Sequence, residues 1–351
     1  MISNKIDFSM IALEDKATKY LADNSLNVHI SMPCPLKVPF HQMFAPIVEN
    51  YNSLHPELPI HCPNISDCSS VDIEDVLKNA KDETALPDII ITTNFRILFA
   101  NGFYDRFVAN HIYEGVMNPK YADKVLPLVS KNLLESNIGV WSFSSWSFVQ
   151  DLTADEPADP IDSWSQLISP EMKGKITVHG HVDKATFSLA YFLQNEFGNQ
   201  GLRQYARNVG DIKHFSQAIK RLNSSDPNKT LLTMLPDVAI SKIPSNKKIK
   251  VLDLKEAKVL SPMIMMVKHS KMEACREILN ILWSEPFEAL LADAGGVLPY
   301  KLDREKTYFL PDFKEIAHTF EKIEAELDKI YIENLPWTEI ESKTTEGGTC
   351  K

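Results

Sequence analysis

The segment Val259–Tyr300 constrains the fold more than any other part of this 351-residue chain. A small residue and a proline, Ser261 and Pro262, open an unbroken apolar run, Met263–Val267. A run of this length and character is typical of a strand that is buried on both faces. The segment therefore predicts a strand inside a sheet that is covered on each side by other elements.

The residues after this run predict two helices and a tight exit. Apolar residues recur there at spacings of three and four, which makes one apolar stripe on a helix: Cys275, Ile278, Leu279 and Leu282. Ser284 restarts the helix, and Pro286 suits a first turn because the missing N–H costs little there. The pair Gly295-Gly296 ends the second helix.

This order of elements resembles the return segment of bacterial extracellular solute-binding proteins, in which a helix packs on the first lobe and a GGVLP-like turn closes it. PIDSWSQLISPEMKGKITV, Pro160 to Val178, is similar to the stretch that opens the second lobe in the cluster binding ferric iron, thiosulfate, polyamines or phosphonates. LPDIIITTN, Leu86 to Asn94, is similar to a first-lobe strand that ends at the ligand. The likeness covers residues 27–300.

The resemblance implies an α/β fold of the type II periplasmic-binding kind, in which each lobe is a mainly parallel sheet flanked by helices and the ligand cleft lies between the lobes. It implies a substrate-binding component of an ABC transport system, or an intracellular derivative of one, with a permease as a possible partner. The residues of these motifs pack the lobes and do not select the solute, so they indicate the fold better than the ligand.

The length agrees with two lobes, because it exceeds what one hydrophobic core usually supports. The predicted organisation is an appendage at 1–25, a discontinuous lobe 1 at 26–137 plus 255–335 that includes the C-terminal helices, lobe 2 at 138–254, and a frayed tail at 336–351.

Lobe 1 is predicted from an alternation of strands and helices, which favours right-handed crossovers and a mainly parallel sheet. The expected elements are a strand at 27–32, a loop at PCPLK, a helix from Pro39 kinked at Pro46, a short strand at 58–62, a helix at 71–79 and a strand at 88–92.

Lobe 2 begins with a crossing strand at 138–150, whose alternation predicts one packed and one open face. The further expected elements are a strand at 175–179, a helix after Asp183 that stops at Gly198, strands at 231–241 and 249–254, and one unbroken amphipathic helix from Phe313 to Ile330.

Composition excludes several classes of protein. The net charge of −10 disfavours nucleic acid as a partner, because phosphate binding needs clustered Lys and Arg. No apolar run of about 18 residues is present, which excludes a spanning helix. Five cysteines form an odd set without the spacing of a disulfide scaffold, which favours reduced thiols. A monomer is expected.

The first 25 residues lack the apolar core and the cleavage site of a secretory signal. The sequence as it stands therefore predicts a cytoplasmic location, or a periplasmic or extracellular one if a leader was removed.

Ligands in doubly wound sheets collect beyond the carboxyl ends of the strands, where helix N-termini present N–H groups and a positive dipole end. Applied to the expected strands, this rule selects twelve ligand-binding candidates: Cys34, Lys37, His41, Thr92, Thr93, Asn94, Trp141, Ser142, His181, Lys184, Thr186 and Ser261. Their mixture of cations, imidazoles and hydroxyls suits a small polar or anionic solute, and a hinge at the crossover segments would close around it.

The segment HGHVDKAT, residues 179–186, has three interpretations. His179, His181 and Asp183 could ligate a divalent metal if one face of the strand end held them together. Alternatively, His181 or Asp183 caps the following helix while Lys184 and Thr186 meet an anion. The third interpretation is a solvated loop.

Cys34 and the aromatic residues of the crossing strand also have alternative roles. A helix dipole beside Cys34 would stabilise its thiolate for nucleophilic or soft-metal chemistry, whereas a lone cysteine in such a loop is more often a packing residue. Trp141, Trp146 and Phe143 could form a wall for a cationic or apolar solute, or fill the core.

Several signatures are absent. Relatives that hold ferric iron use adjacent tyrosines, and the sequence has no tyrosine pair. It has no Gly-rich phosphate loop and no G-x-S-x-G elbow, so neither a nucleotide cofactor nor a serine hydrolase is predicted. The sequence favours a solute-binding protein without cofactor. The alternative is a cytoplasmic enzyme or a metal or metabolite carrier on the same fold, using Cys34 and His179/His181.

Overall fold

The computed structural model of the protein describes residues 21–63, 76–77, 80–154, 160–179 and 185–337. Their contacts form two compact units. Unit 1 contains the residues up to Phe143, Pro262–Leu302 and Phe313–His318; unit 2 contains Ser144–Ser261, Asp303–Asp312 and the residues from Thr319.

Two long strands each contribute residues to both units. β5 (Val140–Asp151) begins in unit 1 and ends in unit 2, and β10 (Lys258–Lys268) runs from unit 2 back into unit 1. The sequence analysis placed all of 255–335 in lobe 1, whereas the contacts group 303–312 and the residues from Thr319 with unit 2.

The sheet of unit 1 has the strand order β2-β1-β3-β10, with β4 (Tyr113–Gly115) also paired to β10. β1 (Leu26–Ser31) is parallel to β2 (Ile60–His61) and to β3 (Ile89–Thr92), and β10 is antiparallel to β3. This mainly parallel sheet is the architecture predicted for lobe 1.

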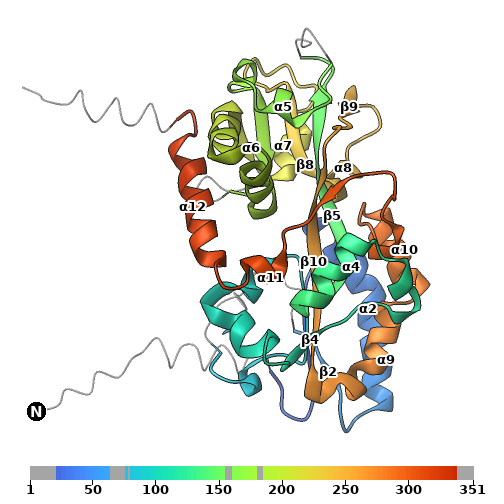
Figure 1. The fold of residues 1–351 in the computed structure, drawn as a ribbon. Helices are drawn as coiled ribbons and strands as arrows, with labels where there is room; N and C mark the ends of the chain where they lie inside the picture. The colour runs from blue at the N-terminus through green and yellow to red at the C-terminus, as the bar shows by residue number, and fades with distance from the viewer. Residues whose placement is uncertain (1–20, 64–75, 78–79, 155–159, 180–184, 338–351) are drawn as a thin grey trace, which may run out of the picture. The chain divides into compact units, whose positions relative to one another are not determined.

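Helices α2 (Cys34–Leu54), α9 (Met272–Leu282) and α10 (Glu285–Asp293) lie together beside this sheet (Figure 1). The core between them is aromatic, with Phe40 5.2 Å from Phe44 and 5.5 Å from Phe287 between ring centroids. The short helix α11 (Phe313–Ile316) packs on α4 (Pro127–Ser136).

The sheet of unit 2 has the order β5-β8-β6-β7, and β9 (Ile249–Val251) also pairs with β5. β6 (Ile176–His179) is parallel to both β8 (Leu232–Pro236) and β7 (Val209–Lys213), and β5 is antiparallel to β8. β11 (Tyr308–Phe309) pairs with the first residues of β10.

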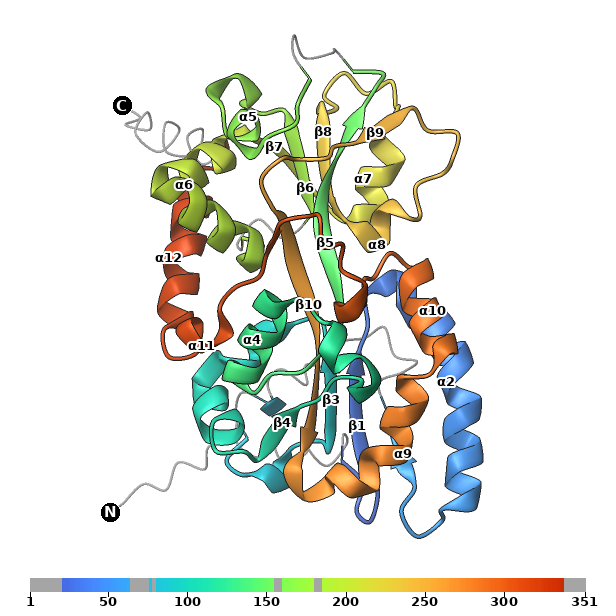
Figure 2. The ribbon, with the colours of Figure 1, turned by 45° about the vertical axis from the view of Figure 1, so that its right-hand side comes forward.

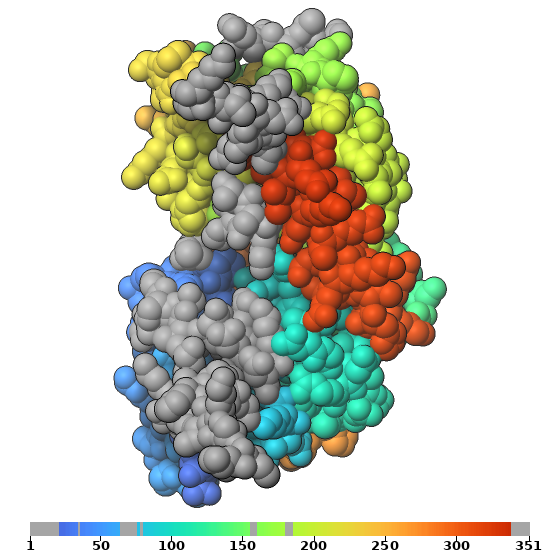
Figure 3. All heavy atoms as spheres, turned by 90° about the vertical axis from the view of Figure 1, so that its left-hand side faces the viewer, coloured from blue at the N-terminus to red at the C-terminus, as the bar shows by residue number. Residues whose placement is uncertain are grey.

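Helices α6 (Phe187–Asn208) and α12 (Phe320–Glu333) cover one side of the unit 2 sheet, with α7 (Phe215–Arg221) on the other (Figure 2). Figure 3 shows α12 on the surface beside α6. The short helices α5 (Trp164–Leu167) and α8 (Asp237–Ile240) complete the unit. No helix in the described residues is both long and apolar enough to cross a bilayer.

The segment from Met263 to Val267 is buried as predicted, with at most 4% of each residue exposed. The strand itself is longer than the prediction, since Ser261 and Pro262 lie inside β10 and do not precede it. The stripe of α9 is also buried, and Ser284 directly precedes α10, which carries Pro286 in its first turn.

Three predicted boundaries are wrong, and the first concerns α2. PCPLK is not a loop but the first turn of α2, which begins at Cys34 and contains Pro39. The carbonyl of Pro33 accepts hydrogen bonds from the N–H groups of Leu36 and Lys37, and Pro35 fits because a first-turn residue needs no N–H donor.

Gly198 interrupts α6 where the sequence predicts the helix to stop. Its φ of 65° and ψ of −177° are not helical, and a second helical part follows it up to Asn208. The strand predicted at 231–241 ends at Pro236, and Asp237 begins α8.

The C-terminal helix is broken between α11 and α12. Phe313 packs against Phe95 in unit 1, whereas Phe320 packs against Phe187 in unit 2. Because the apolar residues on either side of the break have different partners, one straight helix does not form.

The face of β5 that was predicted to be open is only partly exposed. Ser142 is 2% exposed on this face, and Ser144 and Trp146 on the same face are half-buried. On the other face, Ser145 and Ser147 are at most 5% exposed, and the Ser147 hydroxyl donates to Asp237 Oδ1 at 2.6 Å.

Candidate functional site

Two parallel strands of unit 1 end side by side and place the first group of predicted residues. Ser31, the last residue of β1, pairs with Thr92, the last residue of β3. Thr92 is 1% exposed, and its Oγ1 accepts a hydrogen bond from the backbone N–H of Asn94 at 3.0 Å. Thr93 and Asn94 are half-buried and follow this edge directly.

The N-terminus of α2 follows the same edge. Its first-turn carbonyl–amide bonds occupy the N–H groups of Leu36 and Lys37, and no acidic residue lies in that turn. The turn therefore contributes its positive dipole end more than free N–H donors. Lys37 and His41 are four residues apart on one face, and His41 Nδ1 is buried without a partner in the described part of the chain.

Trp141 and Ser142 lie at the start of β5 and are both buried. The Trp141 ring meets Phe40 edge-on at 6.1 Å and lines a cavity in unit 1. The Ser142 hydroxyl is 3.9 Å from Met263 Sδ. Because Trp141 and Ser142 are consecutive residues of a strand, they point to opposite faces of the sheet.

In unit 2 the N-terminus of α6 opens beside β6. The first helical bond joins the Ala190 N–H to the Thr186 carbonyl at 2.9 Å, so the N–H groups of the first turn lack helical partners. No acidic residue lies in this turn. A cavity of about 300 Å³, including its open mouth, lies here, and its lining includes His179, Thr186, Tyr205 and Tyr331.

His179 belongs to an aromatic group at the carboxyl ends of β6 and β7. Its ring stacks with Trp146 at 6.2 Å and meets His214 and Phe215 edge-on at 5.6 Å and 5.9 Å. His179 Nδ1 lies 3.4 Å from the Lys213 carbonyl. Trp146 Nε1 is buried without a hydrogen-bond partner among the described residues.

His214 and Phe215 are not among the candidates from the sequence. The signal that would have found them is β7, because His214 directly follows Lys213, its last residue. Val209–Lys213 contains a glycine and two charged residues and lacks the apolar pattern of a strand. No ligand-binding residue was therefore predicted after it.

Other predicted residues lie partly or wholly outside the described structure. His181, Asp183 and Lys184 fall in the gap at 180–184, and for Cys34 only the backbone is described. Ser261 is a half-buried residue of β10 in unit 2. Within the described residues, no group of three or more His, Cys, Asp or Glu side chains could hold a metal ion.

Two cysteines can be assigned. Cys62 and Cys275 form no disulfide. Burial raises the pKa of the Cys275 thiol to about 12, with a smaller contribution from the charge of Asp88. A thiol in that state is not a nucleophile at neutral pH.

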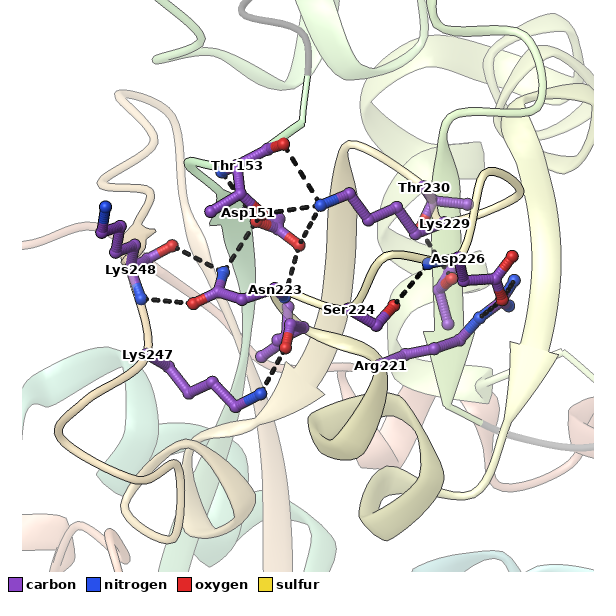
Figure 4. A network of polar contacts seen from close by, with 12 residues as sticks. Asp151, Thr153, Arg221, Asn223, Ser224, Asp226, Lys229, Thr230, Lys247 and Lys248 are labelled. Atoms are coloured by element: carbon purple, nitrogen blue, oxygen red, sulfur yellow. Dashed lines mark hydrogen bonds and ion pairs between the residues drawn. The ribbon is translucent and has the colours of Figure 1, made fainter.

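A polar network in unit 2 surrounds Asp151, which is 2% exposed (Figure 4). Its carboxylate accepts hydrogen bonds from the backbone N–H groups of Asn223 at 2.7 Å and Thr153 at 2.8 Å, and Lys229 Nζ is 3.4 Å away. Arg221 is paired with Asp226 at 2.8 Å. Because the charges are paired within the network, we assign it to stability and not to ligand binding.

The two α/β units, with mainly parallel strands and flanking helices, define the periplasmic-binding-protein fold. The structure resembles the apo ferric ion-binding protein A of Pasteurella haemolytica, with a TM-score of 0.59 at 14% identity over 89% of this chain and 99% of that one. It also resembles the ferric binding protein of Campylobacter jejuni, with 0.57 at 13% identity over 88% and 98%. The spermidine/putrescine substrate-binding protein PotD of Streptococcus pneumoniae gives 0.51 at 11% over 88% and 100%.

The sequence itself places the chain in a family. The pattern of the bacterial extracellular solute-binding proteins matches residues 84–318, which is more than half of the chain. The chain therefore belongs to the bacterial extracellular solute-binding protein family, as its motifs predicted. A comparison with the curated proteins gives no match.

Proposed function

We propose that this member of the family binds a small anionic or polar solute, without catalysing a reaction on it, and delivers it to the permease of an ABC transporter. The observation that carries the proposal is the N-terminus of α6 beside His179, because the positive dipole end of a helix without an acid in its first turn attracts negative charge.

The first turns of both helices favour an anion over a cation. Neither α2 in unit 1 nor α6 in unit 2 has an acidic residue in its first turn. Lys37 and His41 give the start of α2 a cation and an imidazole. The one carboxylate bonded beside the start of α6 in the described residues is that of Asp328, which accepts a hydrogen bond from the Ala185 N–H at 2.9 Å.

Ferric iron is a weaker candidate. The two solved ferric-binding relatives named above share the fold at 13–14% identity, which shows nothing about the ligand of this chain. This sequence has no adjacent tyrosines. Tyr205 and Tyr331 line the α6 cavity together with His179, but the Tyr205 hydroxyl donates to Met234 Sδ at 3.2 Å. Burial raises the pKa of both phenols, which disfavours the phenolate form that a ferric ion requires.

Native mass spectrometry of gently purified full-length protein tests the proposal first, because a retained solute gives its own mass. Calorimetry against phosphate, thiosulfate, citrate, spermidine and ferric iron then ranks the classes. Saturable one-to-one binding of at least one anion is expected. Binding of spermidine or iron alone would overturn the anion assignment, and turnover of the bound molecule would overturn the non-enzymatic role.

The family is described as extracellular, which favours the second of the two locations that the sequence predicts. Fractionation of cells that express the gene from its native start tests this point. Closure upon binding stays a prediction, and small-angle scattering with and without the solute measures it. A radius of gyration that does not fall when the site is saturated would exclude closure.

A further inference from the structure

A second cavity lies entirely within unit 1 and has a chemistry opposite to that of the proposed anion site. Its empty space, counted together with the open solvent at its mouth, is about 310 Å³. Its lining includes four aromatic side chains, one amide and one carboxylate: Trp141, Trp283, Tyr121, Tyr300, Asn118 and Glu288. Trp141 is the only one of these residues among the candidates from the sequence.

Glu288 is a buried acid that forms no direct ion pair in the described part of the chain, although its charge attracts the nearby ammonium group of Lys120. It is 7% exposed, and no ion pair joins it to a basic side chain in the described residues. Its oxygens accept hydrogen bonds from the Tyr300 hydroxyl at 2.7 Å and from Asn118 Nδ2 at 3.2 Å. Two neutral donors and the nearby start of α10 offset only part of the cost of removing a carboxylate from water.

The aromatic walls favour a positive charge. Tyr121 and Tyr300 stack with centroids 3.8 Å apart. Lysine ammonium groups already lie over these rings, with Lys120 and Lys124 each 5.2 Å from Tyr121 and Lys301 5.7 Å from Tyr300. The rings and the carboxylate therefore both attract positive charge, and an added ammonium group has to compete with these lysines for it.

The two tryptophans require a hydrogen-bond acceptor and not a positive charge. Trp141 Nε1 and Trp283 Nε1 are both buried, and neither has a hydrogen-bond partner in the described part of the chain. An indole N–H can only donate, so each is satisfied by a ligand oxygen or a water. A bare cation would satisfy Glu288 and leave both indoles unpaired.

We propose that this cavity is a second ligand site, specific for a small primary ammonium ion that carries an oxygen acceptor. The ammonium group donates to Glu288 and lies against the tyrosine rings, while the oxygen accepts from an indole N–H. Ethanolamine is the simplest molecule with both groups. The site is independent of the proposed transport solute.

The test is calorimetry of the full chain with ethanolamine, with tryptophan fluorescence as a second readout because two indoles line the cavity. Methylammonium lacks the acceptor and ethylene glycol lacks the charge. Ethanolamine is expected to bind saturably and more tightly than either. No saturable binding of ethanolamine, or equal binding of all three, would overturn the proposal.

Glu288→Gln keeps the size of the side chain and removes its charge, and should weaken ethanolamine binding by at least about tenfold. Glu285→Gln is the matched control, because Glu285 is an exposed acid on the same helix. Equal loss in both variants, or none in Glu288→Gln, means non-specific attraction and refutes the site.

Trp283→Phe provides a variant that does not depend on the buried carboxylate. It keeps an aromatic ring and removes one indole N–H, so it should weaken ethanolamine more than methylammonium. A change equal for both ligands would refute the acceptor contact. A high-resolution structure grown with ethanolamine that shows only water beside Glu288 would refute the site altogether.

Discussion

Asp88 and Lys268 form a buried ion pair between β3 and β10, with Lys268 Nζ 3.1 Å from Asp88 Oδ1. Asp88 is 3% and Lys268 7% exposed. Lys268 also donates to the Leu86 carbonyl at 2.7 Å, and Asp88 Oδ2 accepts from the Asn27 N–H at 2.9 Å. These bonds join β1, β3 and β10 at the end of the sheet where β1 and β3 begin.

Lys268→Met is expected to destabilise the protein strongly, because it leaves the Asp88 charge buried without its partner. Removing one member of a buried pair costs about 3–5 kcal/mol of unfolding free energy. Urea denaturation followed by circular dichroism measures the loss.

The matched control is Arg276→Met, which breaks the exposed pair of Arg276 with Glu273. An exposed pair contributes about 0–1 kcal/mol. If both variants lose the same free energy, burial does not set the value of the Asp88–Lys268 pair.

Local pattern was sufficient to predict much of the fold. The apolar run Met263–Val267 and the stripe of α9 are signals that a few consecutive residues carry by themselves. The break between α11 and α12 was not predictable in this way, because Phe313 and Phe320 continue one helical pattern and differ only in their packing partners.

The same distinction holds for the candidate binding residues. Thr92 and Asn94 were selected because a strong apolar run precedes them, and the pairing of β1 with β3 confirms the strand end on which they lie. His214 follows a strand with a weak pattern, and Glu288 looks like an ordinary solvent-facing acid of an amphipathic helix. Only the three-dimensional packing shows that Glu288 lies between two tyrosines and two tryptophans.

Asp151 should make stability fall at acidic pH. Burial raises the pKa of this carboxyl, but hydrogen bonds from Thr153 and Asn223 outweigh burial and lower it to about 2. The unfolded value is about 3.9, so the stabilisation is complete above pH 4 and is lost as the pH falls towards 2. A shift of this size corresponds to about 2 kcal/mol.

Asp151→Asn should therefore be less stable than wild type near neutral pH and approach it at pH 2, as measured by urea midpoints across this range. Asp253→Asn removes an acid that is 79% exposed and should follow the wild-type curve. A constant difference between Asp151→Asn and wild type at all pH values would contradict the assignment.

Gly198→Ala should destabilise unit 2 through the backbone alone. At φ 65° and ψ −177° Gly198 occupies a region that residues with a Cβ avoid, although no atom lies within 4 Å of the added carbon. The expected loss is about 1–3 kcal/mol in thermal or urea unfolding. Gln200→Ala, at an exposed helical position two residues further on, should be neutral or slightly stabilising. A neutral Gly198→Ala would show that α6 tolerates a straight path.

Lys37→Gln tests the charge of the proposed anion site. Lys37 shares one face of α2 with His41, and the first turn of that helix has no acid that would already pair with it. Loss of one charge-assisted hydrogen bond should weaken anion binding by about 1–3 kcal/mol and leave the unfolding free energy within about 0.5 kcal/mol of wild type. Calorimetry with the anion found by mass spectrometry measures the first effect, and urea denaturation measures the second.

Lys242→Gln removes an equal charge from an exposed position in unit 2 and controls for the change in net charge. Equal affinities of the two variants would mean that Lys37 acts only through the overall field of the protein and does not contact the anion.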